Sequence, residues 1–160
     1  MVTLDQEVKF VKSYITLYRE MTGRSILEEW KVEEEAAFCL VPRLCIQTFV
    51  ENSFKYAKVE NTVVPLELAI NANRFSDGKE NYLEIQIRDS GEGYSEQLLE
   101  VLNEAPTEGG LSVGINNLKR RCGFLYEKEV QYAFYNDGGA VSDLFLPWTE
   151  RGSEARRQEV

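Results

Sequence analysis

The segment Ile87-Arg88-Asp89-Ser90-Gly91-Glu92-Gly93-Tyr94 ends a run in which apolar and polar residues alternate, the pattern of a half-buried strand. Asp89 is therefore predicted at a strand end, with two glycines behind it. A carboxylate there is placed to accept hydrogen bonds from an adenine amino group, and Gly91 and Gly93 let backbone approach a flat base. Taken alone the pentamer favours an ordinary turn, because Asp and Gly cluster in turns.

An amphipathic helix is predicted upstream of this segment, with Pro42 in its first turn. Residues three and four apart share a helix face. One face of this helix is mainly apolar and consists of Ile46, Phe49, Val50, Ser53, Phe54 and Ala57. The other face is polar and carries Thr48, Asn52, Lys55 and Tyr56.

The remaining elements are read from hydrophobic period and from turn residues. Helices are predicted over about 5–22, from the Ser95 cap to about 102, and over 114–126, and strands over 26–33, 66–70, 83–87, 130–135 and 140–146. A glycine-containing stretch without periodicity, 103–113, precedes the last helix. Because the strands pair as hairpins rather than alternating strictly with helices, the expected fold class is α+β: a two-layer α/β sandwich with a mixed, mainly antiparallel sheet and helices on one face.

The composition of the chain excludes several classes of function. A chain of 160 residues with 43% hydrophobic residues is long enough for one domain with its own core. The net charge of −9 opposes binding to nucleic acid or anionic lipid, although the cluster 119–121 is basic. Three cysteines without a C-x-x-C pair fit neither a disulfide framework nor a zinc site, and no apolar run approaches the roughly 20 residues of a membrane span. Histidine is absent, which excludes imidazole catalysis on this chain.

Four boxes occur in a fixed order: 49–56 (FVENSFKY), 89–93 (DSGEG), 109–118 (GGLSVGINNL) and 138–141 (GGAV). In this order they resemble the ATP-binding catalytic domain of sensor histidine kinases, a Bergerat-type fold, and most closely the LytS/YesM-type kinases. The resemblance extends from the first helix to Pro147. It implies a Mg²⁺-dependent ATP site that donates the γ-phosphoryl group to a histidine.

The resemblance also assigns residues. It implies Asn52 as the magnesium ligand, and Mg²⁺ does prefer oxygen ligands while keeping several waters. It implies that Asp89, Gly91 and Gly93 lie next to the adenine base. The other implied nucleotide-binding residues are Lys55, Tyr56, Gly110, Ser112, Gly114, Asn117 and Lys119. Taken alone, Asn52 is an exposed helical asparagine, Lys55 is as well explained as a solvated lysine and Tyr56 as a packing residue. Glu51 is the best internal candidate to polarise an attacking group, with a surface glutamate as the alternative.

Ser112 departs from the pattern, because the related kinases commonly have Gly-x-Gly before this helix. A serine adds a Cβ where backbone is expected to approach phosphate. Its presence leaves open a second function, a nucleotide-binding regulatory module with a degenerate lid and no phosphotransfer. An ATP-hydrolysing clamp is disfavoured, because Thr48 stands where such a clamp has a catalytic glutamate.

The missing histidine predicts that the chain is a fragment that does not autophosphorylate alone. The acceptor is then expected on an upstream dimerisation helix, of which 1–22 is the continuation; 23–148 is the ATP-binding domain and 149–160 a flexible charged tail. The expected partners are that histidine-bearing segment, a response regulator and, in the full-length protein, a second copy, with no nucleic acid and no membrane contact by the fragment. The expected location is the cytoplasmic side of a membrane-bound sensor kinase.

Overall fold

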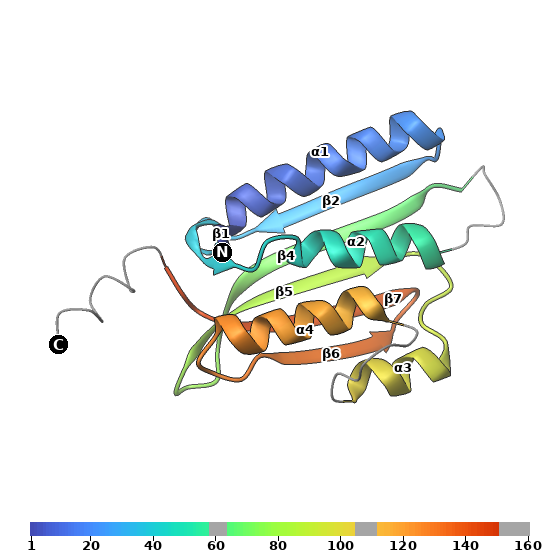
Figure 1. The fold of residues 1–160 in the computed structure, drawn as a ribbon. Coiled ribbons are helices and arrows are strands. Elements are labelled where there is room, and N and C mark those ends of the chain that lie inside the picture. The colour runs from blue at the N-terminus through green and yellow to red at the C-terminus, as the bar shows by residue number, and fades with distance from the viewer. Residues whose placement is uncertain (58–63, 105–111, 151–160) are drawn as a thin grey trace.

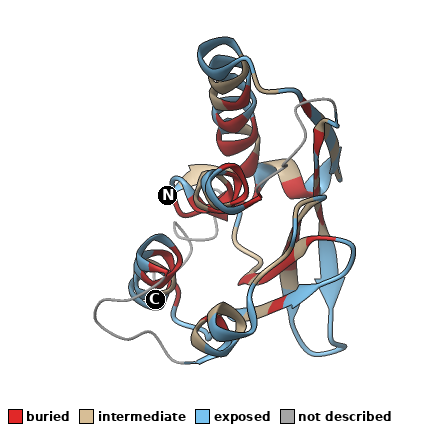
Figure 2. Ribbon diagram, turned by 90° about the vertical axis from the view of Figure 1, so that its right-hand side faces the viewer, coloured by how far each residue is buried: buried red, intermediate tan, exposed pale blue. Residues whose placement is uncertain are grey.

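The computed structural model describes residues 1–57, 64–104 and 112–150 as one sheet covered by helices (Figure 1). The sheet has the strand order β2-β4-β5-β7-β6. Its strands are β2 (Ile26–Val32), β4 (Leu66–Ser76), β5 (Asn81–Asp89), β6 (Gln131–Asn136) and β7 (Ala140–Pro147). The helices are α1 (Leu4–Thr22), α2 (Cys45–Tyr56), α3 (Glu96–Asn103) and α4 (Val113–Leu125). In Figure 2 these helices lie on one side of the sheet, which confirms the predicted two-layer α+β arrangement.

The sheet is mixed, as expected. β2 pairs with β4 in parallel, and every other neighbouring pair in this sheet is antiparallel. The predicted hairpins are both present, but β4 and β5 are longer than their apolar alternation indicated. Polar residues extend that pairing as far as Ser76 opposite Asn81, since backbone hydrogen bonds do not depend on apolar side chains.

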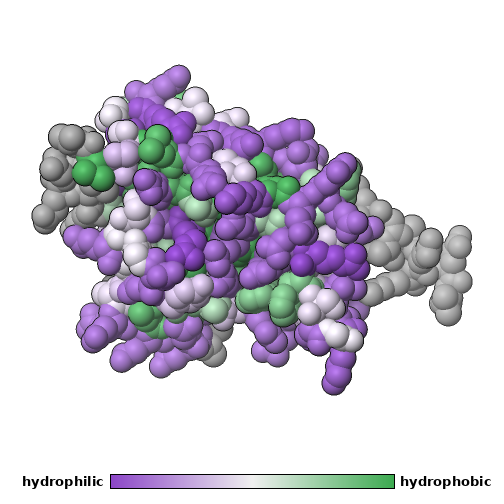
Figure 3. All heavy atoms as spheres, turned by 180° about the vertical axis from the view of Figure 1, so that it is seen from behind, coloured by the Kyte–Doolittle hydropathy of each residue, from purple (hydrophilic) through white to green (hydrophobic). Residues whose placement is uncertain are grey.

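The core lies between the sheet and the helix layer. Leu68 and Ile70 of β4 and Ile85 and Ile87 of β5 alternate with more exposed residues and face the helices. From behind, where the sheet has no helix over it, the surface is mostly hydrophilic with a few apolar residues (Figure 3). This one-sided burial explains the alternating pattern on which the strand predictions rest.

Helix α1 begins and ends at clear local signals. Thr3 and Gln6 form a capping box at its start, with the Gln6 N–H donating to Thr3 Oγ1 and the Thr3 N–H to Gln6 Oε1. Gly23 ends it in the left-handed region at φ 68°, as the sequence predicts. Val11 and Ile15 bury one face of α1 against the sheet. The proposed division of the chain at residue 22 stays a prediction.

Helix α2 starts at Cys45, three residues after Pro42, so the placement of Pro42 in its first turn is wrong. Leu44 precedes the helix with a positive φ of 63° and no side-chain cap. The N–H groups at this end of the helix that have no partner within it donate instead to the carboxylate of Glu7 in α1, which is distant in the sequence. Because local residues do not provide the cap, local patterns could not locate this boundary.

Three short elements were not predicted. They are the two-stranded ribbon of β1 (Val2–Thr3) with β3 (Leu40–Val41), and the 3₁₀ helix η1 (Glu35–Phe38). The Leu40 N–H donates to the Thr149 carbonyl, and Cys39 forms an isolated bridge with Glu150. The first two residues of the expected tail therefore contact the domain, and 151–160 lie outside the described residues.

Candidate nucleotide-binding site

Asp89 ends strand β5, and its carboxylate is held by three hydrogen bonds. Oδ1 accepts from the Gly91 N–H at 2.9 Å and from the Ala140 N–H at 3.2 Å. Oδ2 accepts from the Ser53 hydroxyl at 2.7 Å. A carboxylate offers about four acceptor positions, so one position remains for a ligand. The side chain is therefore fixed in orientation and can still accept one further hydrogen bond.

Glycines allow the backbone to close around Asp89. A Cβ on Gly139, where φ is 145°, would lie 1.8 Å from the Asp89 carbonyl oxygen. A Cβ on Gly91 would lie 2.4 Å from the Ala57 Cβ at the end of α2. These contacts give a different reason for Gly91 from the one inferred from the sequence, because a side chain there would meet the protein itself.

The loop after β5 is fixed to the β6–β7 hairpin. Asn136 Oδ1 accepts from the Tyr94 N–H at 2.7 Å, and its Nδ2 donates to the Tyr94 carbonyl at 2.8 Å. The Tyr94 hydroxyl and Ser142 Oγ are hydrogen-bonded at 2.5 Å, and burial raises the pKa of Tyr94 to about 12. A Cβ on Gly93, at φ 86°, would meet the Asn136 side chain at 2.6 Å. Both glycines of the predicted pentamer thus serve to hold this loop in place.

Helix α2 forms one wall of a small hollow above Asp89, which encloses about 10 Å³ in this conformation. The hollow is lined by Asn52, Ser53, Tyr56, Ala57, Asp89, Gly93, Tyr94 and Ala140. Asn52 is half-buried, and its amide forms no hydrogen bond within the described part of the chain. The structure therefore brings Asn52 and Tyr56 together with Asp89 and Gly93, as the sequence predicts.

The start of α4 lies beside the same helix, one turn before Asn52 in the chain. A Cβ on Gly114 would lie 3.4 Å from Thr48 Cγ2, and Thr48 precedes Asn52 by one turn of α2. From Ala57 back to Thr48 the helix rises about 13 Å, at 1.5 Å per residue. The first turn of α4 contains no acidic residue and no side-chain cap. Its free N–H groups and positive dipole end therefore favour an anion at this end.

Ser112 takes the position before α4 without strain, at φ −141°. Its hydroxyl is buried and, among the residues described, has no hydrogen-bond partner; the same holds for Asn116 Oδ1 on the next turn. Gly110, another predicted nucleotide-binding residue of the same box, lies outside the described residues.

Besides Gly91, Ser112 and Gly114, described above, four predicted site residues in the described chain do not line the hollow. Glu51 is exposed and accepts a hydrogen bond from Gln47 at 2.6 Å. Lys55 is exposed, with its Nζ 5.1 Å from the centre of the Tyr56 ring, and Asn117 is exposed on α4.

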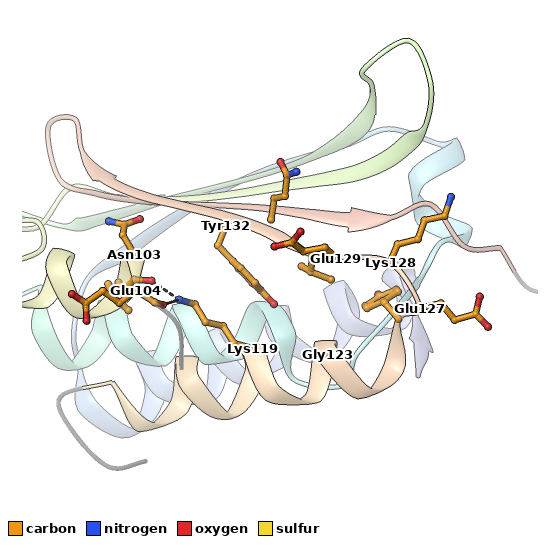
Figure 4. Close-up of a pocket in the computed structure, with 12 residues that line it drawn as sticks. Asn103, Glu104, Lys119, Gly123, Glu127, Lys128, Glu129 and Tyr132 are labelled. Atoms are coloured by element: carbon orange, nitrogen blue, oxygen red, sulfur yellow. Dashed lines mark hydrogen bonds between the residues drawn. The ribbon is translucent and has the colours of Figure 1, made fainter. Parts of the chain in front are cut away.

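Lys119, the fourth, lies elsewhere. Its ammonium group donates to the carbonyls of Leu102 and Glu104 at the end of α3 and lies 5.4 Å from the Tyr132 ring centre. Figure 4 shows it in an open groove of about 810 Å³ between α4 and β6. Burial lowers the pKa of Lys119. In this conformation Lys119 stabilises the end of α3, and its assignment to the nucleotide stays a prediction.

Sequence reasoning did not assign four residues of the hollow: Ser53, Ala57, Tyr94 and Ala140, the last of which lies in the fourth box. Ser53 was placed on the apolar face of α2, yet its hydroxyl donates to Asp89. The signal was available, since a serine in an otherwise apolar stripe requires a polar partner. Ala57 and Tyr94 give no such signal, because they line the hollow only through the way α2 and the loop after β5 pack.

The donor and acceptor set fits a nucleotide with Mg²⁺. Asp89 offers an acceptor for an exocyclic amine, and Asn52 has a free amide oxygen between the Asp89 end and the α4 end. Among the described residues no three carboxylate, cysteine or histidine side chains gather as a metal cluster. One protein oxygen suits Mg²⁺ when phosphate oxygens and water complete its shell.

Comparisons with known proteins agree with this geometry. No protein-family model matches the chain. It is 28% identical over 162 residues to the sensor protein LytS of Enterococcus faecalis, an alignment that covers 97% of this chain and 26% of the relative. It is 26% identical over 125 residues to the sensor histidine kinase YesM of Bacillus subtilis, covering 78% of this chain and 20% of the relative. The chain thus spans about a quarter or less of the length of these relatives.

Solved structures show the same fold. The catalytic domain of histidine kinase ThkA matches with a TM-score of 0.64 at 14% identity, covering 92% of this chain and 94% of that one. Full-length ShkA in complex with AMPPNP matches with a TM-score of 0.58 at 16% identity, covering 93% of this chain and 31% of that one. The chain is therefore homologous to LytS- and YesM-type sensor histidine kinases over most of its length and has the fold of a histidine kinase catalytic domain. The resemblance inferred from the four boxes is confirmed.

Proposed function

We propose that, as the relative of sensor histidine kinases established above, this chain binds ATP with Mg²⁺ and donates the γ-phosphoryl group to a histidine on another segment of its parent protein. One observation carries the proposal: Asp89 is held by three hydrogen bonds at the floor of a hollow whose other wall bears Asn52. The neighbour ShkA, which shares the fold, was solved with AMPPNP, an ATP analogue.

In this proposal the base binds at the end of the hollow nearest Asp89, and the hollow, which encloses about 10 Å³ in this conformation, widens to admit it. The carboxylate accepts from the exocyclic amine of adenine, and the Ser53 hydroxyl holds Oδ2 in position for it. Tyr56 and Tyr94 also line this hollow. Hydrogen bonding to a charged acceptor gives selectivity for a base that carries an amine.

The triphosphate extends along α2 towards α4. Asn52 provides the protein oxygen for Mg²⁺, which supplies charge neutralisation on the phosphates when bound. Gly114 and the free N–H groups of the first turn of α4 receive the phosphate oxygens. Gly110, Ser112, Asn117, Lys119 and Lys55 are the further candidates for this end, and Glu51 for polarising the attacking nitrogen.

In the chemical step the bond between the γ-phosphorus and the β–γ bridging oxygen of ATP breaks, a bond from that phosphorus to a histidine nitrogen forms, and ADP leaves. Positioning and charge neutralisation dominate such a step. This chain contains no histidine, so the acceptor belongs to a dimerisation segment elsewhere in the parent protein. The proposal includes a homodimeric parent, a response regulator that takes the phosphoryl group from the histidine, and a cytoplasmic position in a membrane-bound sensor. The similarity to the sensor protein LytS supports it. Within the described residues, none of the helices combines the length and apolar character that a membrane crossing requires.

Mixing the chain with a histidine-bearing segment of its parent and γ-labelled ATP tests transfer directly. We expect label on that segment, and none on the chain alone. Asn52→Ala is expected to abolish labelling and to remove the Mg²⁺ dependence of ATP binding. Binding of ATP without any labelling would contradict phosphotransfer and leave the regulatory module, for which Ser112 in the Gly-x-Gly position is the supporting observation.

A further inference from the structure

Helix α2 carries Asn52 and Ser53, yet neither of its ends is capped by its own sequence. Leu44 at its start provides no side-chain cap, and Ala57 at its end has no polar side chain that could bond the last carbonyls. A helix leaves about four N–H groups and four carbonyls without partners at its two ends. Both ends of α2 obtain their partners from α1 and the turn after it.

Glu7 of α1 serves the start of α2. Its carboxyl group is buried, and it accepts from the N–H groups of Leu44 at 3.0 Å, Ile46 at 3.2 Å and Gln47 at 3.5 Å. Acidic groups at a helix N-terminus also complement the positive end of the helix dipole. This end of α2 leads to Thr48, which contacts Gly114.

Arg24 serves the other end. It follows Gly23, the residue that terminates α1, and is half-buried. Its Nη1 donates to the Phe54 carbonyl at 2.9 Å, and its Nη2 donates to the Ala57 carbonyl. A guanidinium at a helix C-terminus complements the negative end of the dipole and, being planar, fixes two carbonyls at once.

Arg24 thereby fixes the wall of the hollow closest to the base. Ala57 lies so close to Gly91 that no Cβ fits between them, and Ser53, one turn back, donates to Asp89. The ring of Phe54 stacks on Tyr18 of α1 with centroids 4.0 Å apart, which holds the inner face of the same turn. A shift of this turn would separate Ser53 from Asp89 and free the Asp89 carboxylate from its orientation.

We propose that Arg24 is a positioning residue for nucleotide binding: it holds the last turn of α2 in place, so that Ser53 stays bonded to Asp89 and keeps that carboxylate oriented towards the adenine amine. This inference rests on the proposed function. A positioning role and a purely structural role of Arg24 predict different effects on affinity. The last turn of α2 borders the part of the site that binds the base and is distant from the start of α4, where the phosphates are proposed to bind. Loss of Arg24 should weaken every adenine ligand by the same factor, whatever its phosphate number.

The test measures the affinities of adenosine, ADP and ATP with Mg²⁺ for Arg24→Gln by calorimetry. The matched control is Arg19→Gln, because Arg19 is also half-buried and also makes two hydrogen bonds, to the Ile26 carbonyl at 2.9 Å and Glu28 at 2.8 Å, neither of them to α2. We expect Arg24→Gln to weaken all three ligands about tenfold, with the order of affinities and the Mg²⁺ dependence unchanged. Arg19→Gln should bind as the wild type does.

A second variant and a second readout separate positioning from folding. Arg24→Lys keeps the positive charge but replaces the planar guanidinium with one ammonium group, so it should recover part of the affinity that Arg24→Gln loses. Hydrogen exchange should be faster at the Ala57 amide, which donates to the Ser53 carbonyl at 2.9 Å, in Arg24→Gln than in Arg19→Gln. If the wild type binds and Arg24→Gln matches the control, or weakens ATP alone, the inference is overturned. If the wild type binds none of the three ligands, the proposed function fails and the inference fails with it.

Discussion

Asp89 divides its two carboxylate oxygens between two tasks. Oδ1 accepts from two backbone N–H groups and fixes the loop after β5 to the start of β7. Among the described residues, Oδ2 accepts from the Ser53 hydroxyl alone, and Asp89 lines the hollow. The importance of Asp89 was predictable from its place at a strand end before two glycines. The role of Ser53 was not assigned, because it depends on α2 crossing the end of β5.

Gly91 should tolerate no side chain. In Gly91→Ala the new methyl group would lie 2.4 Å from the Ala57 Cβ, and such overpacking costs about 1–3 kcal/mol of unfolding free energy. Gly123→Ala is the control, because its Cβ meets nothing within 4 Å and alanine in a helix is favoured by up to about 1 kcal/mol. Urea denaturation of both variants measures the difference; equal stabilities would refute the close contact between α2 and the loop.

Glu7 should make stability depend on pH. Burial raises its pKa above the ordinary 4.5, while the three N–H groups it accepts from, and Arg121, lower it. The native state then holds the proton more tightly than the unfolded chain, so the free energy of unfolding falls as pH rises from about 4.5 through the native pKa. We expect the stability of the wild type relative to Glu7→Gln to be greatest at low pH and to decline across this window. A difference that stays flat, or grows with pH, would contradict the raised pKa.

At the scale of elements, a helix end that is fixed by nearby residues could be predicted from the sequence. A helix end that is fixed by residues distant in the sequence could not. α1 has its capping box and Gly23 within its own sequence, and its predicted span agrees with the structure to within a residue. The start of α2 depends on Glu7, which is 37 residues from Leu44, so no sequence window contains both partners. The β1–β3 ribbon is similarly remote and only two residues long on each side.

Two serines stand before neighbouring helices and should differ in their effect on stability. Ser95 caps α3, with its Oγ accepting from the Leu98 N–H at 3.2 Å, so Ser95→Ala should cost about 1 kcal/mol of unfolding free energy. The buried hydroxyl of Ser112 makes no such bond within the described chain, so Ser112→Ala should cost nothing or raise stability slightly. Denaturation curves of the two variants decide this; an equal loss in both would show that Ser112 is satisfied after all.

At the scale of the whole molecule, the two-layer class followed from the hairpins and from one-sided alternation. The strand order did not, because the parallel pairing of β2 with β4 joins segments separated by η1, β3 and α2. The boxes predicted that Asn52, Tyr56 and Gly93 meet at Asp89, since each lies near the end of an element at the same edge. The position of Lys119 was not predictable, because it depends on where α3 ends relative to α4.

The central claim is that Asp89 holds the adenine base of ATP, and calorimetric titration of Asp89→Asn with ATP and Mg²⁺ tests it most directly. The amide oxygen can take the place of Oδ1 and keep the Gly91 and Ala140 N–H groups bonded, which leaves an NH₂ group facing the hollow. The fold should therefore persist, as circular dichroism will show, while ATP affinity falls roughly 10- to 150-fold. An ATP affinity equal to that of the wild type in the folded variant would contradict the account.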